Sequence, residues 1–92
     1  MVENIEMKVY SVRGIKKTEA YNLFTSIDGV SDSGGIATGY FNRALVTFNL
    51  ELSPPISICG RRNEIIKAKS DVEEALGCRL NERKGRTLSI RS

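Results

Sequence analysis

The side chains that most often carry out catalysis are scarce in this chain of 92 residues. It contains no histidine and only two cysteines, Cys59 and Cys78. Histidine is the commonest general base and activates the nucleophile in Ser-His-Asp and Cys-His sites, so those mechanisms are excluded. Two thiols without histidine do not complete a closed zinc site, and their spacing matches no metal motif. We therefore expect a protein that is not an enzyme and that has no metal ion and no cofactor.

Two segments resemble catalytic motifs only superficially. Cys59 is followed by two arginines, but Ile65 stands where the Cys-x5-Arg motif of thiol phosphatases needs arginine. The glycine-rich segment 29–39 lacks the Gly-Lys-Ser/Thr ending of a nucleotide-binding loop, which favours a flexible connection. Both cysteines are then expected to be small apolar residues of the core.

Basic residues near the end of the sequence are the strongest candidates for binding. Residues 1–60 hold five basic and six acidic side chains, residues 61–78 hold four of each, and residues 79–92 hold five basic and one acidic. The net charge of +3 therefore comes from the excess of basic residues in the last segment. Guanidinium groups match phosphate and carboxylate oxygens bidentately, so a short Arg-rich patch predicts a polyanion-binding surface. The candidate residues are Arg79, Arg83, Lys84, Arg86 and Arg91. The alternative is a solvated hairpin whose charge only maintains solubility.

Lys16 and Lys17 form a second, smaller candidate site. They lie between an expected strand and an expected helix, where unpaired N–H groups and the helix dipole attract anions. Alternatively, they are ordinary exposed loop residues.

Hydrophobic periodicity predicts the elements that would position these groups. Alternation over residues 5–12 predicts a strand, and apolar residues with helical spacing predict a helix over residues 18–28, with Thr18 as its N-cap. Residues 36–41 and 44–52 read as two strands that form a hairpin around Asn42-Arg43. The expected helical stripe consists of Ala20, Leu23, Phe24 and Ile27.

The second half of the chain again combines extended segments with one helix. Residues 56–59 read as a short extended segment, and a helix follows that ends at Gly77. Residues 78–80 and 87–91 then alternate again, either as one last hairpin or as a single bent strand. The expected stripe of this helix consists of Ile65, Ala68, Val72, Ala75 and Leu76.

The order of elements predicts one α+β domain over residues 1–92. It corresponds to a ferredoxin-like βαββαβ sandwich, in which two helices cover one face of an antiparallel sheet, with an extra C-terminal hairpin as one option. Because the helices cover only one face, the other face is free to bind a partner or to form a dimer.

Part of the first half resembles the RNA-recognition motif. Ala44-Leu-Val-Thr-Phe48 is similar to the end of the third-strand consensus of that family, and residues 18–30 are similar to its first helix and the following turn. Arg43 and Leu45 occupy the positions of the base-stacking aromatic residues, and Asn42 replaces a glycine. The resemblance therefore supports the fold, and no binding residue is transferred from it. Tyr10 and Tyr40 are the aromatic residues expected to be exposed, and the alternative for either is packing at a sheet edge. Phe48 points to the same side of its strand as Val46 and Leu50, so we expect it in the core.

These observations favour a small, non-catalytic module that engages nucleic acid or a nucleoprotein complex. Five phosphate contacts predict a log–log salt slope of about −3.5 to −4.5. A second hypothesis is an inhibitor or adaptor that docks on an acidic protein surface, similar in size and composition to small phage proteins that block host defence complexes. A third is a homodimeric structural module that pairs through the open sheet face. No apolar run is long enough for a membrane span and no signal peptide is evident, so no membrane partner and a cytoplasmic location are expected.

Overall fold

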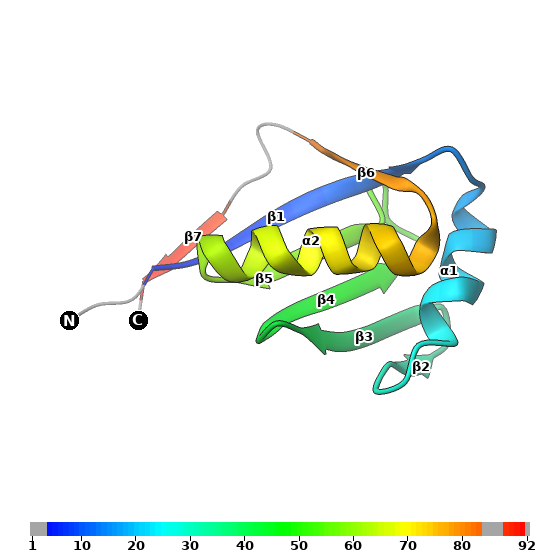
Figure 1. The fold of residues 1–92 in the computed structure, drawn as a ribbon, viewed down its shortest axis with the longest axis horizontal. Coiled ribbons are helices and arrows are strands. Elements are labelled where there is room, and N and C mark those ends of the chain that lie inside the picture. Colours follow the sequence, from blue (N-terminus) through cyan, green and yellow to red (C-terminus); the bar gives the residue numbers. More distant parts are fainter. Residues whose placement is uncertain (1–3, 84–87, 92) are drawn as a thin grey trace.

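The computed structural model describes residues 4–83 and, for the backbone only, residues 88–91. Two helices pack on a sheet whose strand order is β2-β3-β4-β5-β1-β6, with all neighbouring strands antiparallel (Figure 1). The elements are β1 (Asn4–Arg13), α1 (Lys17–Thr25), β2 (Ser31–Ser33), β3 (Ile36–Phe41), β4 (Ala44–Asn49), β5 (Ile56–Gly60), α2 (Arg62–Leu76), β6 (Arg79–Glu82) and β7 (Leu88–Arg91).

The α+β class and the antiparallel sheet with two helices are confirmed. The sheet holds more strands than the four of a βαββαβ unit, since a short β2 pairs with β3 at one edge and the segment 56–59 is a full strand, β5, at the centre. The predicted hairpin of β3 and β4 is correct, with Phe41 in register with Ala44. The second hairpin strand ends at Asn49, three residues before the expected end at Leu52.

The last two strands form one interrupted edge. Both β6 and β7 pair with β1, at Tyr10–Arg13 and Asn4–Met7, on the side that β5 leaves open. The backbone N–H of Arg83 donates to the carbonyl oxygen of Val9 at 3.0 Å, which continues the β6 ladder by one residue. Since β6 and β7 each pair with β1 and not with each other, the predicted C-terminal hairpin is wrong, and the residues form two strands and not the single bent strand of the other prediction.

Helix α1 keeps most of the predicted stripe, since Ala20 and Phe24 are buried and Ile27 packs against the core, but Tyr21 takes the place expected for Leu23. Its buried residues are Ala20, Tyr21 and Phe24, whereas Leu23 is exposed. The ring of Tyr21 packs edge-on against Phe48 with centroids 5.4 Å apart, and its hydroxyl group donates to Asp32 on β2. The buried stripe is therefore rotated toward Tyr21, whose ring and hydroxyl group both find partners in the fold.

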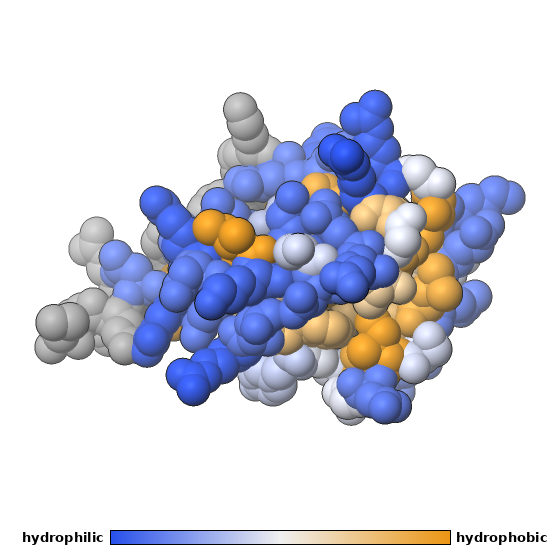
Figure 2. Space-filling model, viewed as in Figure 1, coloured by the Kyte–Doolittle hydropathy of each residue, from blue (hydrophilic) through white to orange (hydrophobic). Residues whose placement is uncertain are grey.

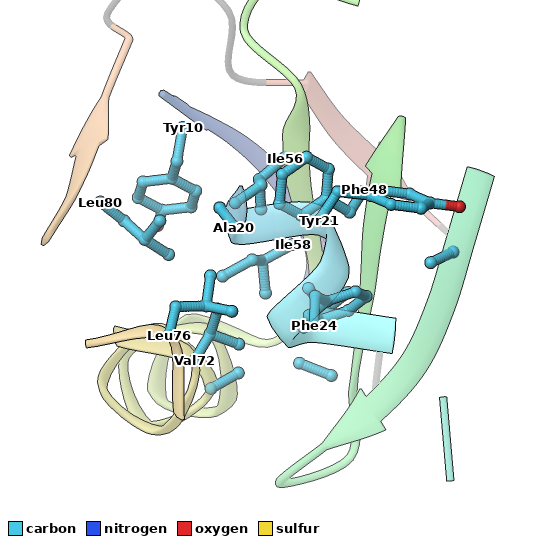
Figure 3. Packing of buried hydrophobic residues seen from close by; sticks show 14 of the residues in the cluster. Tyr10, Ala20, Tyr21, Phe24, Phe48, Ile56, Ile58, Val72, Leu76 and Leu80 are labelled. Carbon is cyan, nitrogen blue, oxygen red and sulfur yellow. The ribbon is translucent and has the colours of Figure 1, made fainter. Parts of the chain in front are cut away.

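Helix α2 matches its prediction closely. Ile65, Ala68, Val72 and Leu76 are buried, and Gly77 ends the helix in the left-handed conformation with φ of 65°. The exception is Ala75, which is exposed. Figure 3 shows side chains of both helices pointing toward those of β1, β4 and β5, which together form the single core.

Candidate nucleic-acid interface

The two helices cover one face of the sheet and leave the other open. Core residues such as Val46, Ile58 and Leu80 alternate along their strands with residues that point to the opposite side. Residues directly opposite each other on neighbouring strands point to the same face, so the strand pairing shows which residues share each face of the sheet. The open face of strands β1 to β6 consists of Ile5, Met7, Val9, Ser11, Arg13, Ser31, Ser33, Ile36, Thr38, Tyr40, Leu45, Thr47, Asn49, Ser57, Cys59, Arg79 and Asn81.

Among these strand residues, the open face carries two arginines and no carboxylate group. The adjoining Arg83, whose backbone extends the β6 ladder, adds a third exposed arginine. Arg13, Arg79 and Arg83 form no ion pair with any residue that the structure describes. Their combined charge equals the net charge of the whole chain, +3. We call these three residues the arginine edge.

Arg13 and Arg79 lie directly opposite each other on β1 and β6. Side chains at such positions have Cβ atoms about 4.5–5.5 Å apart, and like charges there are destabilising. Both side chains are exposed, so water screens part of the repulsion. A bound anion would offset the repulsion that remains between the two arginines.

Alternation along β6 places the carboxylate of Glu82 and the guanidinium group of Arg79 on opposite faces of the sheet. Glu82 points to the helix side, where its carboxylate lies 3.6 Å from the Nζ of Lys8. It therefore neutralises a cation on the helix side, and the arginines of β6 are not neutralised by the neighbouring residue in the chain.

The structure brings some of the predicted basic residues together and separates others. Arg79 and Arg83 lie four residues apart along one edge, a span of about 13 Å. Arg91 is in register with Asn4, whereas Arg79 is in register with Arg13, so their backbones lie about 30 Å apart along β1. Lys84 and Arg86 are outside the described residues.

Lys16 and Lys17 begin α1 at the corner where β1 ends. Lys16, not Thr18, is the N-cap, and its carbonyl oxygen accepts from the N–H of Ala20 at 3.0 Å. Lys16 is exposed and Lys17 is half-buried. The two lysines follow Arg13 closely in the chain, so they border the arginine edge at one end.

Arg13 was not identified from the sequence. It looked like the terminus of a strand followed by Gly14, and its importance depends on the pairing with Arg79, which is distant in the chain. The only local signal was that alternation from the buried Tyr10 places Arg13 on the opposite face.

Of the aromatic residues expected to be exposed, only one is. Tyr40 lies on the open face and its side chain is 75% exposed, whereas Tyr10 is 2% exposed and belongs to the core. Burial first, and then the carboxylates of Glu82 and Glu73, raise the pKa of Tyr10 to about 12. Phe48 is fully buried, as predicted.

The cysteines are free thiols that are both partly buried. Cys78 packs against the core as predicted, and burial together with the Glu73 carboxylate raises the pKa of its thiol. Cys59 lies on the open face between Met7 and Leu45, so its assignment to the core is wrong. A central strand has two faces, and periodicity over five residues did not show which one Cys59 occupies.

The helix side has a different character. A groove of about 650 Å³ runs between α2 and the β1–β6 pair, with Tyr10 and Leu80 among the residues that line it. Figure 2 shows this side, where hydrophilic residues cover most of the α2 region and hydrophobic residues gather toward α1. Lys8 pairs with Glu82 and Lys69 pairs with Glu73 at 3.5 Å, whereas Arg13, which also lines the groove, has no ion pair with a described residue.

Three comparisons add no homologue to these findings. No protein-family model, curated protein or solved structure matches the chain. Among the described residues, no cluster of three or more histidine, cysteine or acidic side chains is placed to hold a metal ion. Neither helix in the described part of the chain has the length and apolar character needed to cross a membrane.

Proposed function

We propose that this chain is a small non-catalytic module that binds nucleic acid, alone or within a nucleoprotein complex, through the open face of its sheet. The observation that supports this function best is the charge of that face, which combines the arginine edge with no carboxylate group among its described strand residues. Such a surface attracts phosphates, and its described strand residues include no carboxylate that would repel them.

The arginine edge would provide the phosphate contacts in this proposal. Three guanidinium groups line one side of the face, and Lys16 and Lys17 add auxiliary positive charge at the corner. Lys84, Arg86 and Arg91 stay candidates from the sequence.

The rest of the open face suits the sugars and bases of a strand that crosses the sheet. Ser57, Thr47 and Thr38 form a row of hydroxyl groups from β5 to β3. Tyr40 stands on β3, four strands from β6, or about 19 Å at the usual strand spacing. An exposed tyrosine can stack on a base, which contributes about 1–3 kcal/mol where it has been measured. With a single aromatic residue there, we expect weak sequence preference and a preference for single strands.

A binding assay with charge-matched variants tests this function. Fluorescence anisotropy with a labelled single-stranded oligonucleotide and a duplex of equal length should show binding that weakens as salt rises. Arg79→Gln and Arg83→Gln should each lower the affinity about tenfold or more, as expected for losing a charged hydrogen bond. Lys69→Gln is the control, because it makes the same charge change on the helix side. No binding to either probe, or equal losses in all three variants, would rule the function out.

A second candidate function is docking on a protein, as an inhibitor or adaptor. It is favoured by one apolar row on the open face, which runs through Met7, Cys59, Leu45 and Tyr40. A pull-down from nuclease-treated lysate separates the two functions, because a protein partner survives the treatment and a nucleic-acid tether does not. A homodimer through the same row would instead show twice the monomer mass in light scattering.

The fold allows a finer proposal as well. Strands β4, β5, β1 and β6 lie in the order of a ferredoxin-like sheet, and α2 connects β5 to β6 across β1. We propose that these four strands and the two helices are a ferredoxin-like unit to which the β2 and β3 strands are added at one edge.

A further inference from the structure

The groove between α2 and the β1–β6 pair adjoins the arginine edge. Arg13 and Asn81 belong to the open face by strand register, and both also line the groove. This is possible because β6 stands at one end of the strand order, so the helix side and the open face meet along it. A nucleotide that contacts the arginine edge can therefore extend into the groove.

Tyr10 presents a hydroxyl group to the groove. The residue is 2% exposed and lines the groove, and its hydroxyl group forms no hydrogen bond with any residue that the structure describes. The described part of the chain contains no fully enclosed polar side-chain atom that lacks a partner, so this hydroxyl group is accessible from the groove. A phenol in such a position is a hydrogen-bond donor that a ligand can satisfy.

Two carboxylate groups lie near this hydroxyl group and, after burial, contribute to its raised pKa. Glu82 is directly opposite Tyr10 on β6, and Glu73 reaches the same strand from α2, where its Oε2 atom accepts from the backbone N–H of Leu80 at 2.9 Å. Each carboxylate also lies within 3.6 Å of a lysine Nζ atom. A carboxylate has about four acceptor positions, so both groups keep lone pairs for a ligand.

Apolar groups border the groove as well. Ile66 on α2 is 61% exposed and Leu80 on β6 is buried, and both line the groove. Its volume of about 650 Å³ lies within the range of small-molecule sites. The carboxylates are already paired with lysines, which disfavours a cationic ligand and favours a neutral ring with polar edges.

From this arrangement we infer that the groove holds one base of a nucleic-acid strand bound at the arginine edge, and that it prefers a base with an exocyclic amino group to thymine or uracil. The amino group donates to a carboxylate, which is how acidic side chains recognise cytosine. The Tyr10 hydroxyl group donates to a ring nitrogen or carbonyl oxygen of the same base. This base preference rests on the proposed function, since the strand must first bind at the arginine edge. With one base selected in this way, the overall sequence preference stays weak.

The test uses fluorescence anisotropy to compare oligothymidine with oligomers in which adenine, cytosine or guanine replaces one central thymine. At least one replacement should raise the affinity of the full chain about fivefold or more. Tyr10→Phe removes the hydroxyl group and keeps the ring, so the ratio of the substituted to the unsubstituted affinity should fall close to one. Glu82→Gln should lower the same ratio, because a carboxamide has fewer acceptor positions than a carboxylate.

Glu74→Gln is the matched control, because it makes the same charge change at an exposed residue of α2 that does not line the groove. It should keep the full ratio. Equal affinities for all four oligomers, a full ratio in Tyr10→Phe, or equal reductions in Glu74→Gln and Glu82→Gln would overturn the base preference and leave the proposed function standing. No binding of any oligomer would contradict the proposed function and the base preference with it.

Discussion

Arg13 and Arg79 form a pair of like charges whose placement opposes folding and suits the proposed binding of an anion. They oppose each other across two strands with no carboxylate partner among the described residues. Like charges in this position oppose folding, whereas a bound polyanion would relieve the repulsion. Such a conflict is expected of a surface that binds an anion, and a surface whose charges only maintain solubility does not need it.

Arg79→Glu should therefore raise stability while it weakens nucleic-acid binding. The new carboxylate faces Arg13, so the free energy of unfolding at low salt should increase by about 0.2–1 kcal/mol. Urea denaturation measures this change. Arg83→Glu is the matched control, because its position faces Val9 and offers no cation to pair with. A loss of stability in Arg79→Glu would mean that the two arginines do not repel each other as the register implies.

Tyr10 gives the fold a specific sensitivity to alkali. Its pKa is raised from 10.0 to about 12 in the folded state, so the folded protein keeps the phenol proton over a range in which the unfolded chain loses it. The resulting stabilisation is complete below pH 10 and is lost as the pH rises toward 12. The denaturation midpoint of the unmodified protein should fall as the pH rises from 10 to 12, and the midpoint of Tyr10→Phe should fall less. Equal slopes in the two proteins would contradict this origin.

At the scale of elements, Gly60 sets how closely β5 approaches its neighbours. A Cβ atom at this position would lie 3.2 Å from the Cβ of Ala44 and 3.3 Å from both its Cα and the Oε1 of Glu64. Gly60→Ala should therefore lower the free energy of unfolding by about 1–3 kcal/mol, the usual cost of overpacking. Ser57→Ala, on the open face of the same strand, should change it by less than about 0.5 kcal/mol. Similar values for both variants would show that β4 can shift to make room.

The β3–β4 turn makes an independent prediction about strain. Arg43→Gly should stabilise the protein by roughly 1 kcal/mol, because glycine adopts positive φ without the steric cost. Arg43→Ala keeps the Cβ atom and should give no such gain. Thermal denaturation of the two variants compares them directly. If alanine stabilised as much as glycine, the cause would be removal of the charge and not relief of backbone strain.

The sequence predicted those elements whose signals are local. Gly77 ends α2 as expected, because a left-handed C-cap needs a residue without a Cβ atom. The Asn42-Arg43 hairpin was found from the two alternating runs beside it. Rotation of α1 toward Tyr21 was missed, since it depends on Phe48 and Asp32 far along the chain.

The proposed binding face could be predicted only in part for the same reason. Arg79 and Arg83 were found from composition, but composition did not show that Glu82 points away from them toward Lys8. Arg13 was missed because its partner is distant in sequence. The absence of acids among the described strand residues of this face is a property of strand order and register, which no single segment encodes.

At the scale of the whole molecule, the described ion pairs all lie on one side of the sheet. The helix side contains the described ion pairs, including that of Glu6 with Arg62, and the open side holds the arginine edge. A polyanion that approaches the open face meets an attractive field that is not cancelled locally. Nucleic acid is therefore expected to bind on the side of the sheet away from α1 and α2.

The salt dependence of nucleic-acid binding tests this account most directly. Each phosphate that an arginine neutralises contributes about 0.7–0.9 to the magnitude of the slope of log affinity against log salt concentration. Replacing Arg13, Arg79 and Arg83 together with glutamine should reduce that magnitude by about 2 to 3, whereas Lys69→Gln should leave it unchanged. An undiminished slope in the triple variant would show that the nucleic acid does not contact the arginine edge.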